Sequence, residues 1–105
     1  MRHNKSNYVD HGLLRNSPMV SWPGITVGTP EWFDWLKQDH IVQFHYEDTT
    51  ASYTGKKEWR GESSFWYAFT RVGCKVRKTY LGKSENLTFD VLHKAAQHFS
   101  ELAIG

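Results

Sequence analysis

A second cysteine and a long apolar run are both missing from this sequence of 105 residues. Cys74 stands alone, so the chain cannot form an intramolecular disulfide or a thiolate metal cage. No apolar run approaches the roughly 18 residues that a membrane-spanning helix needs. The polar residues 1–7 also lack the apolar centre of a signal peptide. We therefore expect a soluble, cytoplasmic protein.

Catalytic and metal-binding patterns are missing as well. His40 and His45 are five residues apart, as are His93 and His98, and this spacing separates the two rings in a strand or a helix. Gly82-Lys83-Ser84 resembles the end of a phosphate loop, but the upstream glycine is wrongly spaced. We find no catalytic constellation, and we expect no enzyme activity, no metal and no cofactor.

Positive charge is concentrated in residues 55–83. This segment has eight basic and two acidic side chains, a net charge of +6. The other residues have five basic and nine acidic side chains, a net charge of −4, so the whole-chain charge of +2 hides a polarised molecule. Trp66, Tyr67, Phe69 and Tyr80 alternate with the basic residues. Such a segment suits a polyanion, because Lys and Arg attract phosphates and flat rings can contact bases or sugars.

Hydrophobic periodicity predicts a helix at each end of a sheet. Thr29 can cap a helix that begins at Pro30 and ends near Gln38, and Thr88 can cap a last helix that continues to about Ala103. Alternating patterns predict strands at 41–46, 52–60, 65–72 and 75–81. The expected fold class is α+β: a short N-terminal helix, an antiparallel β-meander of three to four strands, and a C-terminal helix packed on one sheet face.

The domain organisation follows from composition. Residues 1–27 are rich in Asn, Ser, His and Pro, and we expect them to form a flexible N-terminal tail. Residues 28–105 then form a single small α+β domain, which agrees with the usual size of one domain. The residues expected in its core are Trp32, Phe33, Leu36, Tyr67, Phe69, Tyr80, Leu92, Ala96 and Phe99.

A two-residue turn at Gly73-Cys74 sets the pairing of the last two strands. The predicted pairs are Thr70–Arg77, Ala68–Thr79 and Trp66–Leu81. One face then holds Phe65, Tyr67, Phe69, Val76 and Tyr80, with Arg71 and Lys78 toward its rim. The other face holds Ala68, Thr70, Lys75, Arg77 and Thr79, with Trp66 and Leu81 at one end. We expect the apolar face to receive the last helix and the basic face to stay open, although a shift of one residue would exchange them.

Several stretches resemble a known bacterial module. They are Gly28-Thr29-Pro30-Glu31-Trp32-Phe33-Asp34-Trp35-Leu36, Glu58-Trp59-Arg60-Gly61, Phe65-Trp66-Tyr67-Ala68-Phe69, and Gly73 to Leu92 with its Tyr80-Leu81-Gly82-Lys83-Ser84. They are similar to the small N-terminal module that precedes the ATPase part of large LuxR-type, MalT-like transcriptional regulators. The resemblance spans residues 28–104 and implies a bacterial protein with a role in transcription regulation. The chain has no ATPase and no helix-turn-helix, so the activity of a whole regulator is not implied.

A more distant likeness is one of architecture only. The arm-type DNA-binding domain of tyrosine integrases and the plant ethylene-response-factor domain both lay a three-stranded sheet on DNA, with one helix behind it. This likeness implies DNA contacts on the open face. The residues concerned are Lys56, Arg60, Thr70, Lys75, Arg77 and Thr79.

We therefore predict a small non-enzymatic nucleic-acid-binding or transcription-regulatory protein, with double-stranded DNA preferred to RNA as its partner. The candidate binding residues are Lys56, Lys57, Arg60, Trp66, Thr70, Arg71, Lys75, Arg77, Thr79 and Lys83. One alternative is a protein–protein interaction module that docks through its aromatic helix or its tail. A second is single-stranded nucleic acid, with Trp59 or Trp66 stacking on bases. A third is that the Lys and Arg residues only solubilise an exposed face.

Overall fold

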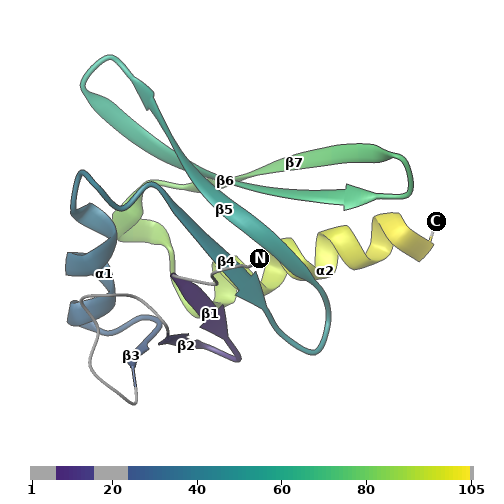
Figure 1. Ribbon diagram of the computed structural model, residues 1–105, viewed down its shortest axis with the longest axis horizontal. Coiled ribbons are helices and arrows are strands. Elements are labelled where there is room, and N and C mark those ends of the chain that lie inside the picture. Colours follow the sequence, from purple (N-terminus) through teal and green to yellow (C-terminus); the bar gives the residue numbers. More distant parts are fainter. Residues whose placement is uncertain (1–6, 16–23, 105) are drawn as a thin grey trace, which may run out of the picture.

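One mixed β-sheet with two helices on a single face makes up the protein (Figure 1). The structure is a computed structural model and describes residues 7–15 and 24–104. In chain order the elements are β1 (Tyr8–Asp10), β2 (Leu13–Arg15), β3 (Ile25–Thr26), α1 (Pro30–Lys37), β4 (Gln43–Glu47), β5 (Ser52–Arg60), β6 (Ser63–Val72), β7 (Lys75–Gly82), the 3-10 helix η1 (Ser84–Asn86) and α2 (Phe89–Ile104). The strand order is β3-β2-β1-β4-β5-β6-β7, with β1 parallel to β4 and every other pair antiparallel.

The α+β class, the β4–β7 meander and both helix starts are confirmed. Thr29 caps α1 by accepting the Trp32 backbone N–H at 3.4 Å, and Pro30 occupies the first turn, where it loses no helical hydrogen bond. Thr88 accepts the Val91 N–H at 3.3 Å at the start of α2. Neither α1 nor α2, the α-helices of the described chain, has the length and apolarity needed to cross a membrane.

The N-terminal part of the sheet corrects the sequence-based expectation, because the first elements are strands and not a helix. Within residues 1–27, expected to be a tail, β1 pairs with β4, β2 with β1, and β3 with β2. Val9 and Leu14 are fully buried there. Strands of two or three residues carry too little periodicity to be recognised, and β1, on which β2 and β3 build, depends on pairing with the distant β4. The rest of that range, residues 1–6 and 16–23, lies outside the described residues.

The turn at Gly73-Cys74 and most of the predicted register are confirmed. Gly73 has a φ of 64°, which favours glycine. Thr70 pairs with Arg77 and Ala68 with Thr79. The predicted Trp66–Leu81 pair is wrong, because a bulge between Trp66 and Tyr67 makes Trp66 the partner of Gly82.

The assignment of the two sheet faces is also wrong. The helices lie on the covered face, which holds Phe44, Tyr46, Tyr53, Gly55, Lys57, Trp66 and Ala68. The open face holds the rings of Phe65, Tyr67, Phe69 and Tyr80, and α2 runs along the other side of β6 and β7 (Figure 1). The physical reason lies in β4 and β5, whose register places the rings of Phe44 and Tyr53 on the same face as Trp66 and Ala68.

The buried core therefore differs in part from the predicted one. Trp32, Leu36, Leu92, Ala96 and Phe99 are buried as expected, and Phe33 is partly buried against them. Tyr67 and Phe69 are only partly buried and Tyr80 is 56% exposed, because all three lie on the open face. In their place, the core contains the rings of Phe44, Tyr46, Tyr53 and Trp66.

Small residues under the helices allow this packing. Gly55 lies beneath the ring of Phe44, and a Cβ added there would come within 2.7 Å of the ring. Gly55 pairs with Ala68, so the middle of the covered face is low and accepts large rings from both sides. The Phe44 ring contacts Trp32 of α1 and Trp66 of β6, with centroids 5.7 and 5.1 Å away.

Buried polar groups fix α2 in position. Trp32 Nε1 donates to the Leu87 carbonyl at 2.7 Å, and Tyr53 Oη donates to the Leu92 carbonyl at 2.8 Å. Asp48, in the turn after β4, accepts Tyr46 Oη at 2.6 Å and lies 2.9 Å from His93 Nδ1. Burial by itself raises the pKa of the Asp48 carboxyl. Hydrogen bonds from Tyr46, His93 and two backbone N–H groups outweigh the burial, and the pKa lies below its usual value.

The packing of α2 can be tested at Phe99, which is buried and has its ring 5.7 Å from that of Tyr53. We expect Phe99→Ala to lower the free energy of unfolding by about 3–5 kcal/mol, as large-to-small core substitutions do. Urea denaturation measures this change. Val76→Ala is the control, since Val76 is exposed on the open face; equal effects of the two substitutions would contradict the packing of α2.

The Asp48 network predicts a pH dependence of stability. Because its folded pKa is lowered, Asp48 contributes stability that is present above the unfolded pKa of about 4 and is lost as pH falls through the folded pKa. We expect Asp48→Asn to destabilise the protein at pH 7 and to lose this disadvantage as the pH falls below the unfolded pKa of about 4 and through the lower folded pKa. Urea midpoints of both proteins across this range measure it, and a difference that stays constant with pH would refute the assignment.

Candidate nucleic-acid interface

The open face of β5, β6 and β7 forms a continuous surface of rings and basic side chains. Its residues are Thr54, Lys56, Glu58 and Arg60 on β5, Phe65, Tyr67, Phe69 and Arg71 on β6, and Val76, Lys78 and Tyr80 on β7. Across the strands, Lys56 pairs with Tyr67 and Tyr67 with Tyr80, so a cation and two rings form one row. Phe69 pairs with Lys78 in the next row.

The ammonium groups of this face lie over its rings. Lys78 Nζ is 4.3 Å from the centroid of Tyr67 and 5.4 Å from that of Phe69. Lys56 Nζ approaches Phe69 from the neighbouring strand, also at 5.4 Å. The electron-rich faces of the rings stabilise the ammonium groups by about 0.5–1 kcal/mol each at exposed sites. The rings therefore hold the positive charges in place on an uncovered surface.

Further basic groups extend the surface. Arg60 Nη2 donates to Tyr67 Oη at 3.4 Å, and Lys83 Nζ lies 5.9 Å from the centroid of Phe65 at the far corner. Arg71 is exposed beside the hairpin turn. Glu58 is the one acidic side chain on the open face of these three strands, and it forms an ion pair with Lys78 at 3.2 Å. The face remains strongly positive after that pairing.

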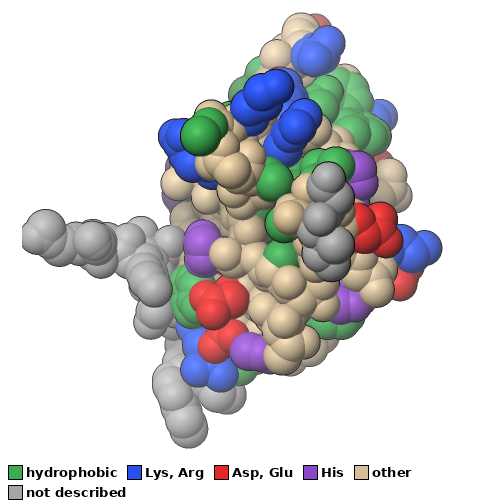
Figure 2. All heavy atoms as spheres, turned by 90° about the vertical axis from the view of Figure 1, so that its right-hand side faces the viewer, with side chains coloured by type: hydrophobic (Ala, Val, Ile, Leu, Met, Phe, Trp, Pro, Cys, Tyr) green, Lys and Arg blue, Asp and Glu red, His purple; other side chains and the backbone are tan. Residues whose placement is uncertain are grey.

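The positive charge does not continue to the other half of the sheet. On β1 and β4 the same side holds Asp10 and Glu47, with Tyr8 stacked on His45 at a centroid distance of 5.3 Å and donating to Glu47. Figure 2 looks onto the end with the β6–β7 turn. It shows Lys and Arg side chains gathered above, with hydrophobic side chains between them, and acidic side chains lower down. On this side of the sheet, β1 and β4 therefore carry acidic side chains and β5–β7 carry basic ones, while Arg15 adds a positive charge on β2.

Two residues predicted to bind belong to the interior. Trp66 is fully buried, and its Nε1 donates to Ser84 Oγ at 2.9 Å, so it cannot stack on a base. Lys57 is 9% exposed and donates to the carbonyls of Leu36 and Gln38 at 3.0 and 3.1 Å. Burial lowers the pKa of Lys57. Its ammonium group caps the C-terminal end of α1, where positive charge is favourable.

Four other predicted residues lie on the side of the helices. Thr70, Thr79, Lys75 and Arg77 share the covered face with Ala68, by the confirmed register. Thr70 donates to the Ser52 carbonyl at 3.2 Å, while Lys75 and Arg77 are exposed near the hairpin tip. The structure brings together on the open face only Lys56, Arg60 and Arg71 of the predicted set, with Lys83 at its corner.

Sequence reasoning missed the role of Tyr67, Phe69, Lys78 and Tyr80 as surface residues. The signal was available in β4 and β5, where Phe44, Tyr46 and Tyr53 already supply an apolar face. Trp59, the other ring considered for stacking, is 50% exposed, but it lies on the covered side of β5, with Lys57 Nζ 5.8 Å from its centroid.

Among the described residues, no group of three or more His, Cys, Asp or Glu side chains could hold a metal ion. No protein family, curated protein or solved structure matches this chain. Support for the candidate interface therefore comes only from the geometry and charge of the open face.

The different fates of Lys56 and Lys57 can be tested by stability. We expect Lys57→Ala to lower the free energy of unfolding by about 1–3 kcal/mol, because two carbonyls lose their donor and Trp66 loses packing. Lys56→Ala, its neighbour on the open face, should change stability by less than about 0.5 kcal/mol. Urea unfolding of both variants measures the difference, and a reversed order would show that the two faces are wrongly assigned.

Proposed function

We propose that this chain is a small non-enzymatic protein that binds nucleic acid, double-stranded DNA in the first place, through the open face of β5–β7. The observation that carries the proposal is an uncovered sheet surface whose rings hold basic side chains in place. The sequence of residues 28–104 also suggests a resemblance to a module of bacterial transcriptional regulators, and a regulatory role is part of the proposal on that ground alone, since no comparison with known proteins supports it.

The dimensions of the surface suit a DNA major groove. Neighbouring strands lie about 4.8 Å apart, so the outer two of three strands are about 10 Å apart. The major groove is about 12 Å wide and accepts a narrow β-ribbon. Lys56 and Arg60 lie on β5 at one side of β6, and Lys78 lies on β7 at the other side, so these side chains can reach phosphates of the two groove walls.

Single-stranded nucleic acid is a second candidate, and one observation favours it. Tyr80 is 56% exposed, and its ring meets that of Tyr67 edge to face with centroids 5.3 Å apart. Exposed rings beside cations form a stacking platform for unpaired bases, worth about 1–3 kcal/mol per base. Tyr80 is therefore the ring that we propose to stack on bases, in place of Trp66, which the sequence suggested for this role and which is buried.

Docking of a protein through the aromatic helix receives less support. Trp32, Trp35 and Leu36 of α1 are buried in the core, and Phe33 packs partly against it. A partner would find little of these rings on the surface.

Two charge-matched double variants test the proposal. Lys56→Ala with Arg71→Ala removes one Lys and one Arg from the open face, and Lys75→Ala with Arg77→Ala removes the same pair from the covered side. We expect only the first to weaken binding strongly and to reduce the slope of log K against log salt by about 2, since each lost phosphate contact accounts for about 0.9. Gel-shift titrations at two salt concentrations measure both quantities.

The same titrations separate the candidate partners. A loss on Tyr80→Ala that is larger for single strands than for duplex would favour the stacking platform. Equal losses for the two double variants would show that binding depends on overall charge and not on the open face. Absence of binding to any oligonucleotide at low salt would refute the proposed function and favour a protein partner.

A further inference from the structure

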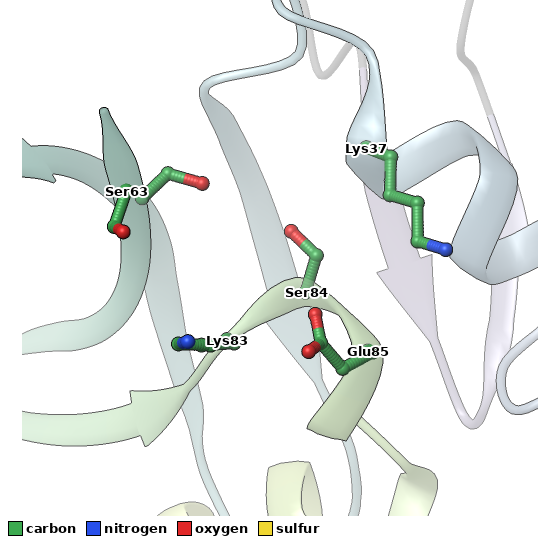
Figure 3. A pocket seen from close by; sticks show the side chains of 6 residues that line it. Lys37, Ser63, Lys83, Ser84 and Glu85 are labelled. Carbon is green, nitrogen blue, oxygen red and sulfur yellow. The ribbon is translucent and has the colours of Figure 1, made fainter.

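A polar hollow of about 250 Å³ lies away from the centre of the open face, where three segments meet (Figure 3). It is bordered by Lys37 at the end of α1, by the start of β6, and by the junction of β7 with η1. Its lining residues are Lys37, Ser63, Ser64, Lys83, Ser84 and Glu85. Pockets for drug-sized ligands usually have volumes of about 300–1,000 Å³. This hollow is smaller, so a small chemical group fits it better than a whole nucleotide.

The two lysines of the hollow have no carboxylate partner within the described chain. Ion pairs there engage Lys78 and Lys94, with Glu58 and Asp90, but neither Lys37 nor Lys83. Neither ammonium group is therefore held by a carboxylate, although the exposed Lys37 side chain extends away from Ser84 and Lys83 in Figure 3 and has to turn toward them to reach a shared anion. Lys57 contributes to the positive potential near the hollow. Its ammonium group already donates to the carbonyls at the C-terminal end of α1, so these carbonyls do not compete for Lys37, and it lies 5.4 Å from the Trp66 ring.

Ser84 is the buried donor of the hollow. It is 6% exposed, and its Oγ accepts the Trp66 Nε1 proton at 2.9 Å. That bond orients the oxygen and leaves the hydroxyl proton without an acceptor among the described residues. Figure 3 shows the Ser84 hydroxyl directed into the space between Ser63 and Lys37. A buried hydroxyl proton is costly unless an oxygen accepts it, so the hollow favours an acceptor at this point.

The carboxylate of Glu85 favours an anion that still carries a proton. Its carboxylate also lines the hollow and has no ion-pair partner in the described chain. A fully ionised oxyanion such as sulfate has acceptors only and meets this carboxylate with repulsion. Inorganic phosphate at neutral pH keeps a proton, which it can donate to Glu85 while its other oxygens accept from Lys37, Lys83 and Ser84.

We propose that this hollow is a binding site for a phosphoryl group, held by Lys37 and Lys83, oriented by Ser84 and selected over sulfate by Glu85. The site is distinct from the open face, although Lys83 lies between the two and its Nζ is 5.9 Å from the centroid of Phe65. The phosphoryl group can come from the free ion or, in its singly protonated form, from a small phosphorylated molecule or the 5′ end of a strand bound to the open face. The proposal does not depend on nucleic-acid binding.

The test is a titration of the full chain with inorganic phosphate at constant pH and ionic strength, followed by backbone amide NMR shifts. We expect saturable shifts at residues 63–64 and 83–85, with sulfate binding more weakly. Lys37→Gln, Lys83→Gln and Ser84→Ala should each weaken phosphate about tenfold, as the loss of one hydrogen bond to a charged group does. Lys94→Gln, an exposed lysine on α2 outside the hollow, is the control and should bind as the parent does.

The outcomes separate the possibilities. Non-saturable shifts, shifts equal in phosphate and sulfate, or unchanged binding by both lysine variants would overturn the proposal. If Ser84→Ala impairs folding through Trp66, the lysine variants, both on exposed positions, still decide it. Competition by a 5′-phosphorylated oligonucleotide but not by its 5′-hydroxyl form would identify a strand end as the source. Phosphate binding without such competition would identify the free ion or a small phosphorylated molecule.

Discussion

The pairing of β5 with β6 is the constraint on which the rest of the structure depends. It places Gly55 opposite Ala68, so the covered face has almost no side-chain height at this point, next to the large Lys57–Trp66 pair. Only such a low surface can accept the Phe44 ring, which would clash with any Cβ at Gly55. The helices then close over that ring, and a single contiguous core results, as expected when one sheet face is covered.

This packing leaves the other face with rings and cations that have no helix to cover them. Uncovered rings are common on protein surfaces, but a group of them beside several basic side chains is informative. The ammonium group of Lys78 lies over these rings and puts a charge on the edge strand β7, and a charged lysine on an edge strand disfavours pairing with another chain. The same arrangement combines positive charge with flat apolar surface, the two properties that the proposed nucleic-acid partner requires.

Much of the local structure could be predicted because it depends on neighbouring residues. The caps at Thr29 and Thr88, the turn at Gly73-Cys74 and the limits of β5 follow from short-range hydrogen bonding and backbone preference. The short strands β1–β3 could not, since their place in the sheet depends on the pairing of β1 with the distant β4, and neither could the bulge beside Trp66. The candidate site was predicted least well, because assigning a strand to the wrong face places every one of its side chains on the wrong side of the sheet.

The sequence by itself determined the α+β class, the order of the β4–β7 meander and the concentration of basic residues in 55–83. It determined them because periodicity and charge are properties of neighbouring residues. Only the tertiary structure decided which side of the sheet the helices cover, and so that Lys57 and Trp66 are interior while Lys78 and Tyr80 are exposed. That choice depends on the summed ring volume of three paired strands, and no single strand carries this information.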